Sequence, residues 1–408
     1  MTESPTPRRF PRSVPVVLAF IAVFFAAINL RAGIASLGSV LGEVLEAFNT
    51  SGALAGVITA MPGLFFAIMG LGAVPLAARF GLSKTLTVGM VLTLIGLAVR
   101  PWVGEIWIFI ALTAFVVAGI ALANVLLPAW IKNHGGRHIV ALMTIYSSVL
   151  GLSGAIGPLS ILLFNGNDAW RWSLFIWASF AAVQLVVWVI VAARTGFDFP
   201  SASADTAAGN GGSLWKSPTA VFLMLFFGLQ SMNAYIQMGW LPQIFIDGGA
   251  SANVGSVALA LVGALNVIGG LVMPLIIDRV HNLAIFPVLF SVCSATGYVG
   301  LYFTADTVPL LWALFLGLGG FCFPTAIALI PARSRSPLVT ARLSGFVQPV
   351  GYFVAALGPF LIGIIYEATG QWSAILLTLV GGTVAMAVTG FRASRRGYID
   401  DELNAASR

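Results

Sequence analysis

Charged residues are scarce in this sequence of 408 residues. Asp, Glu, Lys and Arg make up 8% of it, whereas soluble domains carry about 25% charged residues. Hydrophobic residues make up 59%. A surface that faces water on all sides cannot be built from this composition, so a soluble globular domain is excluded. The basic residues are scattered singly between apolar blocks rather than gathered in a stripe, which argues against a nucleic-acid partner.

Cysteine and histidine are also scarce, with 2 Cys and 3 His. Cys293 and Cys322 lie inside apolar blocks, where we interpret them as small buried hydrophobic residues rather than as a disulfide or a metal site. His134, His138 and His281 lie at the ends of apolar blocks, and we expect them to be solvated. The sequence contains no G-x-x-x-x-G-K-[ST] loop and no H-E-x-x-H motif. We therefore expect no enzyme, no cofactor, no metal and no ATP-driven transport.

The sequence does contain a series of apolar blocks of roughly 20 residues, the length that lets a helix cross the membrane. Barrel strands would alternate over shorter segments. An all-α integral membrane protein is predicted, because helices satisfy their own backbone groups in lipid. We expect the first block to be retained, since no A-x-A cleavage pattern follows the basic residues 1–13. The twelve predicted transmembrane helices lie at residues 14–40, 52–77, 84–103, 106–131, 138–164, 170–194, 218–245, 252–277, 283–304, 308–331, 339–366 and 372–391.

A polar stretch divides the twelve helices into two groups of six. Residues 195–217 are rich in Ser, Ala, Gly, Asp and Asn and have no helical period, which is typical of a flexible linker. The Ala-Ile-Gly-Pro segment at 155–158 is echoed by Ala-Leu-Gly-Pro at 356–359, an offset of about 200 residues. Two six-helix repeats are typical of transporters that bind substrate at the midplane. The predicted units are an N-terminal half at 1–195, a linker at 196–217 and a C-terminal half at 218–408.

The positions of Lys and Arg predict the orientation. All but three of the 20 lie at one set of alternate connections and at the two termini; the exceptions are Arg31, Arg100 and Arg171. Since Lys and Arg concentrate on the cytoplasmic side of a bilayer, we predict that both termini and the linker are cytoplasmic. Arg100, at the outer end of the third helix, is expected to snorkel to the membrane surface.

Arg31 is the most informative position. It lies about 17 residues into the first helix, where a buried cation costs roughly 2.5–3.5 kcal/mol. No Asp or Glu lies in the middle of any predicted helix, so no resident ion pair is expected. We predict that Arg31 faces a central cavity and offers its forked guanidinium to an anionic or carbonyl-bearing substrate. The alternative is a structural Arg bonded to helix-end carbonyls, or one that snorkels outward. Asn29, on another face, is expected to pack against a neighbouring helix.

Amides and tyrosines interrupt two later helices. Gln230, Asn233 and Gln237 recur at i, i+3 and i+7 and therefore share a face of the seventh helix. Gln348 and Tyr352 are four residues apart on the eleventh. These side chains are typical of a polar cavity lining, although interhelical hydrogen bonding is an alternative. The predicted substrate-binding residues are Arg31, Asn124, Tyr146, Gln230, Gln237, Trp240, Gln348 and Tyr352.

The loop after the second helix resembles a motif of the major facilitator superfamily. Residues 79–84 read Arg-Phe-Gly-Leu-Ser-Lys, where the superfamily has G-x-x-x-D-R-x-G-R-K. The acid position is Ala78 here, whereas the second half keeps an acid-base pair as Asp278-Arg279 without the glycine. The resemblance implies gating roles at the cytoplasmic side for Arg79, Asp278 and Arg279. The alternative is that these residues only anchor the chain on the cytoplasmic side.

A longer resemblance covers most of the chain. The segments that carry it are Asn29-Leu30-Arg31, Gly119-Ile120 with Asn124 and Pro128, Gly228-Leu229-Gln230-Ser231, Trp240-Leu241-Pro242, Leu343-Ser344-Gly345, Gly351-Tyr352 and Gly358-Pro359. They resemble the cyanate and 2-nitroimidazole transporter family. The resemblance implies a major facilitator fold, in a monomer of the bacterial cytoplasmic membrane. It further implies rocker-switch transport of a cyanate-like anion or a small planar polar molecule.

The sequence leaves the coupling and two other functions open. Proton symporters commonly carry an intramembrane carboxylate, and the predicted helices have none, so we favour facilitated diffusion, exchange, or a proton that travels with a weak-acid substrate. A multidrug-type efflux antiporter is an alternative, but an intramembrane Arg without an acid disfavours lipophilic cations. A non-transporting membrane sensor is the other, and the longest loop is too short for an output domain.

Overall fold

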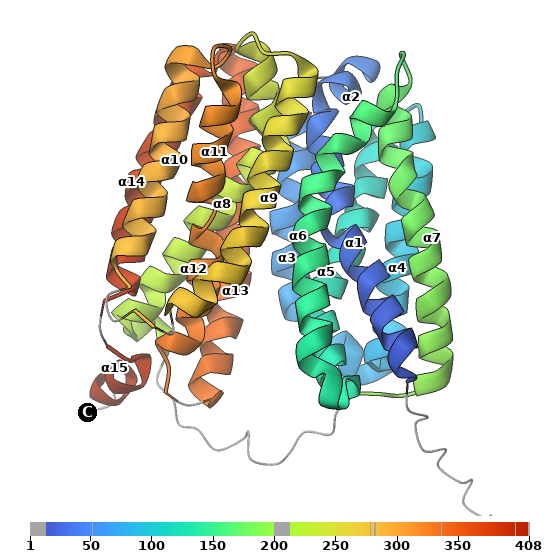
Figure 1. Ribbon diagram of the computed structural model, residues 1–408, viewed down its shortest axis with the longest axis vertical. Helices are drawn as coiled ribbons and strands as arrows, with labels where there is room; N and C mark the ends of the chain where they lie inside the picture. The colour runs from blue at the N-terminus through green and yellow to red at the C-terminus, as the bar shows by residue number, and fades with distance from the viewer. Residues whose placement is uncertain are drawn as a thin grey trace, which may run out of the picture.

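The computed structural model describes residues 14–50, 52–199, 213–277, 279–280, 283–335, 337–395 and 397–406. Within these ranges the regular structure is entirely helical, and twelve spans are long and apolar enough to cross a membrane (Figure 1). The predicted fold class is thereby confirmed. Most of the predicted linker at 196–217 lies outside the described residues.

The helices before and after the linker form two groups, which we call the N-terminal and C-terminal halves (Figure 1). The N-terminal half contains α1 (Val16–Ser39), α2 (Leu41–Ala47), α3 (Gly52–Phe80), α4 (Leu82–Val99), α5 (Ile106–His134), α6 (Ile139–Leu159) and α7 (Ala169–Thr195). The C-terminal half contains α8 (Pro218–Asp247), α9 (Ala252–Ile277), α10 (Ile285–Thr304), α11 (Pro309–Gly319), α12 (Cys322–Ala332), α13 (Pro337–Thr369), α14 (Ser373–Ala393) and α15 (Ile399–Ala406).

The tenth span is predicted as one helix at 308–331, but in the structure it consists of two helices. It is divided into α11 and α12 at Gly320 and Phe321. Glycine weakens a helix interior because it leaves the backbone free. A Cβ at Gly320 would also lie 2.5 Å from Oδ1 of Asn266 on α9. The break therefore coincides with close packing of this span against its neighbour.

Each half has its own apolar core. Trp130 and Trp188 are fully buried in the N-terminal half, as are Phe226 and Phe227 in the C-terminal half. The repeated Gly-Pro segments occupy equivalent helix pairs, since α6 packs on α1 and α13 packs on α8. A Cβ at Gly157 would lie 2.9 Å from the Cα of Ala32, so this glycine is what lets α6 approach α1.

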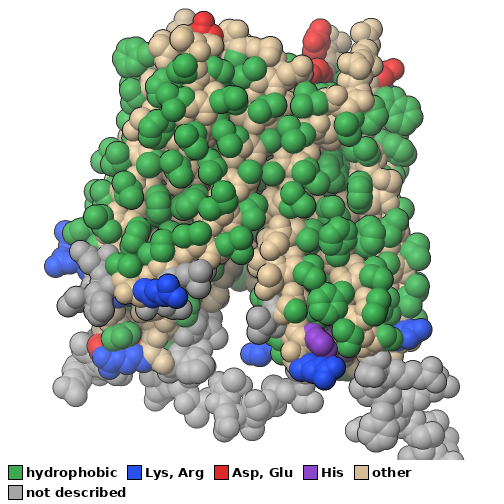
Figure 2. Space-filling model, in the orientation of Figure 1, with side chains coloured by type: hydrophobic (Ala, Val, Ile, Leu, Met, Phe, Trp, Pro, Cys, Tyr) green, Lys and Arg blue, Asp and Glu red, His purple; other side chains and the backbone are tan. Residues whose placement is uncertain are grey.

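Charged side chains are segregated between the two ends of the molecule. We call the end that holds the start of α1, the end of α7, the start of α8 and the end of α14 the terminal face, and the other end the opposite face (Figure 1). Figure 2 shows Lys and Arg gathered near the terminal face and Asp and Glu gathered mainly at the opposite face. That the terminal face is cytoplasmic remains a prediction from the Lys and Arg positions.

The two halves meet along α3 with α13 and along α6 with α9. Close to the opposite face the contact is backbone to backbone, because a Cβ at Gly363 of α13 would lie 2.5 Å from the Cα of Gly56 on α3. In α6 and α9 a Cβ at Gly263 would lie 2.7 Å from the carbonyl oxygen of Gly154. At the terminal face, Figure 2 shows a notch between the halves. The halves are thus closed at one end and parted at the other.

Candidate functional site

Arg31 of α1 lies at the contact between the two halves. Its aliphatic carbons pack over Gly154 of α6, where a Cβ would be 3.6 Å from the Arg31 Cβ. Its Cζ is 5.7 Å from the centroid of the Phe323 ring on α12, in the C-terminal half. The side chain is half-buried, and no hydrogen bond or ion pair to it is found among the described residues. Arg31 is therefore a membrane-depth cation whose donors are available to a ligand.

Three tyrosines surround this guanidinium. Tyr146 of α6, Tyr235 of α8 and Tyr352 of α13 are each close enough to interact electrostatically with Arg31. The ring centroids of Tyr235 and Tyr352 are 6.2 Å apart. Together with Phe323, these residues form what we call the central cluster. It combines one positive charge, phenol hydroxyls and aromatic rings from both halves.

Two phenylalanines extend the aromatic wall of the central cluster. The Phe66 ring on α3 is 5.3 Å from the Tyr352 ring and 6.3 Å from the Tyr235 ring, measured between centroids. Phe227 lies 5.0 Å from Tyr352 on the other side, edge to face. Aromatic walls of this kind favour planar ligands that stack or meet a ring edge. The sequence gives no signal for these rings, because single Phe residues are common in apolar helices.

The predicted site residues fall into different places. Tyr146 and Tyr352 belong to the central cluster, and Asn124 joins its edge, because the Tyr146 hydroxyl donates to Asn124 Oδ1 at 3.4 Å. Gln348 instead donates to Ser344 of its own helix at 2.7 Å, and Gln230 to the adjacent Ser231 at 2.7 Å. Both amides are thus occupied locally in this state.

Gln237 and Trp240 are not brought to the central cluster. Gln237 donates to the hydroxyl of Tyr298 on α10 at 3.1 Å, and that hydroxyl donates to Asn233 at 2.5 Å. Trp240 is fully buried nearer the opposite face, with its ring 5.7 Å from Trp372. Asn233 and Gln237 on the amide face of α8 thus make interhelical hydrogen bonds to α10, the alternative to a cavity lining. Tyr235, about 200° around α8 from Gln237, interacts electrostatically with Arg31.

Arg100 overturns the expectation that it snorkels. The residue is 1% exposed, and its Nη2 donates to the carbonyl oxygen of Gly33 on α1 at 2.9 Å. The 3₁₀ turn at Arg100–Trp102 follows α4 directly and keeps the side chain among helices rather than at the membrane surface. Arg100 is therefore a second cation inside the N-terminal half. Asn29 follows its prediction, since it donates to Gln184 of α7 at 2.7 Å.

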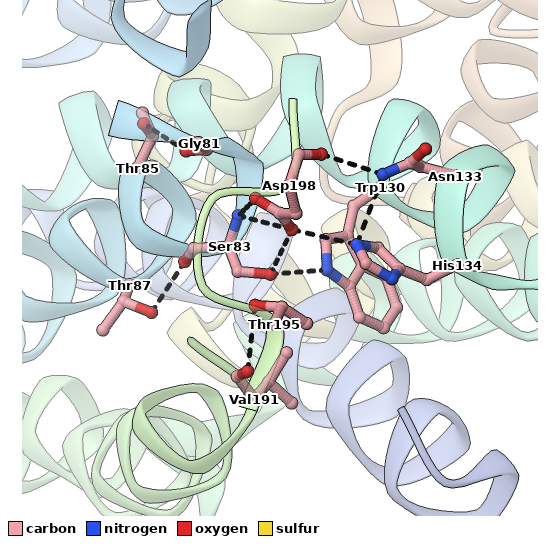
Figure 3. A network of polar contacts seen from close by, with 10 residues as sticks. All are labelled: Gly81, Ser83, Thr85, Thr87, Trp130, Asn133, His134, Val191, Thr195 and Asp198. Atoms are coloured by element: carbon pink, nitrogen blue, oxygen red, sulfur yellow. Dashed lines mark hydrogen bonds and ion pairs between the residues drawn. The ribbon is translucent and has the colours of Figure 1, made fainter. Parts of the chain in front are cut away.

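A polar network ties the N-terminal half together at the terminal face (Figure 3). The Asp198 carboxylate accepts from the Ser83 backbone N–H at 3.0 Å and from the Ser83 hydroxyl at 2.6 Å, so it caps the start of α4 from a distant part of the chain. It also contacts His134 Nε2 at 2.9 Å. Gly81 leaves room for it, with φ +93 and a Cβ that would lie 2.9 Å from Asp198 Oδ1. His134 is therefore paired, not solvated as expected.

The electrostatics of this network favour a charged Asp198. Burial on its own raises the pKa of the Asp198 carboxyl, but hydrogen bonds from His134 and Ser83 outweigh it and hold the pKa below its ordinary value. The network lies next to the loop that resembles the superfamily motif, in which Ala78 occupies the acid position. Asp198, which is 115 residues further along the chain than Ser83, thus brings an acid to this loop through its hydrogen bond with Ser83. Sequence spacing gave no signal for this contact.

Two of the predicted gating residues, Arg79 and Arg279, lie at the terminal face, and neither has a hydrogen bond or ion pair to the other half in the described part of the chain. Arg79 is exposed, with its Cζ 5.4 Å from the centroid of the adjacent Phe80 ring. Arg279 is also exposed, and Asp278 lies outside the described residues. A hydrogen bond joins the halves at the opposite face, where the Ala53 N–H at the start of α3 donates to Glu367 Oε2 of α13 at 2.8 Å.

Comparison with known proteins identifies relatives of this chain. The sequence profile of the Major Facilitator Superfamily matches residues 19–359. The 2-nitroimidazole transporter of Escherichia coli (strain K12) is 31% identical over 383 residues, which cover 93% of this chain and 96% of that protein. The cyanate transport protein CynX of the same strain is 26% identical over 363 residues, 87% of this chain and 92% of that protein. The resemblance inferred from the motifs is confirmed.

The fold is also that of solved transporters. The crystal structure of a D-xylose-proton symporter superimposes with a TM-score of 0.74 at 13% sequence identity, covering 93% of this chain and 97% of that one. At this identity the likeness establishes the arrangement of helices alone.

Proposed function

The chain belongs to the major facilitator superfamily, a family of membrane transporters, and we propose that it carries a small planar anion or small planar polar molecule between its two halves. It is a multi-pass protein of the bacterial plasma membrane. The observation that carries the proposal is Arg31, a half-buried guanidinium at membrane depth with no hydrogen-bond or ion-pair partner among the described residues. A cation at that depth is costly unless a ligand or water satisfies it.

The surroundings of Arg31 support the planar shape of the substrate. The guanidinium is itself planar and presents its donors as a fork. Tyr235, Tyr352 and Phe323 supply ring faces and edges around it, and the phenol hydroxyls supply further donors. A cyanate-like anion or a nitro-substituted heterocycle offers a planar or linear group with acceptor atoms at its rim. The two named relatives from Escherichia coli carry substrates of these two kinds.

The two ends of the interface support alternating access. The halves are in backbone contact near the opposite face and parted at the terminal face. Separation of α3 from α13, with closure of the notch, would expose Arg31 to the other side. If the terminal face is cytoplasmic, as predicted, the notch supports a state in which substrate exchanges with the cytoplasm. On this proposal, residues such as Arg79 and Arg279 form the cytoplasmic gate when the halves close.

Facilitated diffusion, exchange, or transport of a weak acid with its proton is the coupling that we propose. Within the described membrane spans the only carboxylates are Asp247 and Glu367, both at the opposite-face ends. Neither lies beside Arg31, so no carboxylate is placed to share a proton with the substrate site. A multidrug-type antiporter for planar neutral compounds is the second candidate, because the aromatic wall of Phe66, Phe227 and Tyr352 suits such molecules.

Transport in proteoliposomes tests the proposal. Arg31→Gln should lower kcat/KM for cyanate by about 10- to 150-fold, the usual effect of losing charge-assisted hydrogen bonds, while Arg31→Lys keeps part of the activity. Uptake of neutral 2-nitroimidazole should fall less than uptake of cyanate. Arg194→Gln, which changes an exposed Arg outside both the central cluster and the proposed gate, is the matched control. Full cyanate transport by Arg31→Gln would contradict the proposal, and so would failure of the wild type to transport any compound of either kind.

A further inference from the structure

A small cavity lies between the central cluster and the opposite face. Its volume is about 20 Å³, which is room for roughly one water molecule. Its walls come from α1, α3, α5 and α8, together with Arg100. Tyr235 lines this cavity and also belongs to the central cluster. The cavity is therefore the next space on a path from Arg31 toward the opposite face.

Two polar atoms in the cavity wall have no partner. Arg100 Nε and Thr113 Oγ1 are buried and have no hydrogen-bond partner among the described residues. Thr113 is 1% exposed, as is Arg100. Arg100 uses Nη2 to hold the Gly33 carbonyl, but no carboxylate pairs with it in the described part of the chain. A cation that served only to join α4 to α1 would not need an unsatisfied donor in the wall of a cavity that also contains an unsatisfied hydroxyl.

We propose that Arg100 and Thr113 form a second anion subsite, which receives a small monovalent anion entering from the opposite face before it reaches Arg31. The proposal rests on the proposed function, because it assigns a second station on the same path. In the present state the cavity has room for about one water. Opening of the opposite face would widen it, and the anion would then bind to the guanidinium and the hydroxyl.

Close contacts at small residues of the cavity wall hold α8 against α1 and α3, and these contacts can separate. Gly38 of α1 leaves no room for a Cβ beside the Met238 carbonyl of α8, and a Cβ at Gly239 would lie 2.5 Å from Cγ2 of Thr59. These contacts join α1 and α3 of one half to α8 of the other. When α8 moves away with its half, Met238 and Gly239 leave the cavity wall while Arg100 and Thr113 stay on the N-terminal half. The subsite is thus open only to the opposite face.

The test is the sidedness of KM. Uptake of cyanate is measured in vesicles of known orientation, so that anion is presented to the opposite face or to the terminal face. Arg100→Gln should raise KM at the opposite face by about 10-fold or more and leave KM at the terminal face within about two-fold. Arg100→Lys should recover part of the loss. Thr113→Val should raise KM at the opposite face by a few-fold, about the effect of one neutral hydrogen bond.

The matched control is Thr93→Val. Thr93 of α4 is as buried as Thr113 but lies outside the cavity, and its hydroxyl already donates to the Gly89 carbonyl at 3.0 Å, so this variant should not produce a sided change in KM. Equal changes at both faces for Arg100→Gln and Thr113→Val would overturn the subsite and leave Arg100 as a joint between helices. No change in either would overturn it as well. If Arg100→Gln does not fold, Arg100→Lys and Thr113→Val carry the same test.

The failure of this inference is distinguishable from that of the proposed function. If Arg31→Gln abolishes cyanate transport while the Arg100 and Thr113 variants show no sidedness, only the subsite is wrong. If Arg31→Gln leaves cyanate transport intact, the anion pathway itself is wrong.

Discussion

The two ends of the interface between the halves are built differently. At the opposite face the halves touch through glycine backbone, with Gly56 of α3 against Gly363 of α13. At the terminal face they are parted, and each half is tied within itself. Asp198 caps α4 in the N-terminal half, while Glu402 of α15 accepts from the Thr219 N–H at the start of α8 in the C-terminal half. The difference indicates that each half keeps its own shape. Closure of the opposite face depends instead on glycines, which have no side chain to hold α3 and α13 apart.

The largest effect is expected from filling the glycine contact. In Gly363→Leu the new Cβ meets the backbone of Gly52 and Gly56, which cannot rotate away as a side chain does. Overpacking of this kind costs about 1–3 kcal/mol, enough to shift the population of the closed opposite face by roughly 5- to 150-fold. We therefore expect the opposite face to be open much more of the time.

Thiol labelling measures this shift. A cysteine at Leu37, which lines the small cavity, is introduced with Cys293 and Cys322 replaced by serine, and an impermeant reagent is added at the opposite face. Labelling should be faster in the Gly363→Leu protein. Gly381→Leu is the control, because a Cβ at Gly381 meets nothing within 4 Å. Unchanged labelling would mean that the glycine contact does not hold the closed state.

A smaller effect is expected from the tie within the N-terminal half. Asp198→Asn removes a charged cap from α4 and should lower the free energy of unfolding by about 1–2 kcal/mol at neutral pH. The folded-state pKa of Asp198 is lowered, so the contribution of its charge is present above the unfolded-state value of about 3.9 and is lost as the pH falls through the folded-state value. Wild type and variant should therefore converge only below about pH 4.

Thermal unfolding in detergent between pH 3 and pH 8 checks this prediction. The exposed Asp306→Asn, far from the network, should leave the unfolding temperature unchanged. A difference in unfolding temperature between wild type and Asp198→Asn that stayed constant through acid pH would show that Asp198 stabilises the protein by its shape and not by its charge. Because Gly363→Leu acts between the halves, it should not reproduce this pH dependence.

The same contrast separates what the sequence predicts from what it does not. Block length and composition predicted the twelve spans, because a membrane helix must be apolar over a fixed length. Arg31 was identified since a membrane-depth cation is rare and needs a cause. The sequence places Arg100 at the membrane surface, because position along a helix does not show which neighbouring helix buries a side chain. In the structure α1 contacts Arg100 through the Gly33 carbonyl.

Contacts between distant segments account for the rest. Asp198 accepts a hydrogen bond from Ser83, 115 residues earlier in the chain. Gln237, which helix periodicity predicts in a cavity, donates to the Tyr298 hydroxyl on α10. A period of 3.6 residues groups side chains into faces but does not say whether a face meets the pathway or another helix. Tyr235 lies on the pathway side of α8 although it is not on the amide face of that helix.

The smallest effect is expected from a side-chain hydrogen bond that joins the halves at the opposite face. Glu367 accepts from the Ala53 N–H at 2.8 Å, at the exposed start of α3, where a negative charge also interacts favourably with the helix dipole. A contact of this kind contributes about 0.3–1 kcal/mol, so Glu367→Gln should increase labelling of the cysteine at position 37 by roughly two- to five-fold, less than Gly363→Leu does. High salt should reproduce part of the increase in the wild type and little of it in Glu367→Gln, because the charge that salt screens is then absent. A Glu367→Gln effect as large as that of Gly363→Leu would reverse the comparison, since closure would then depend on a side-chain charge rather than on the absence of side chains between α3 and α13.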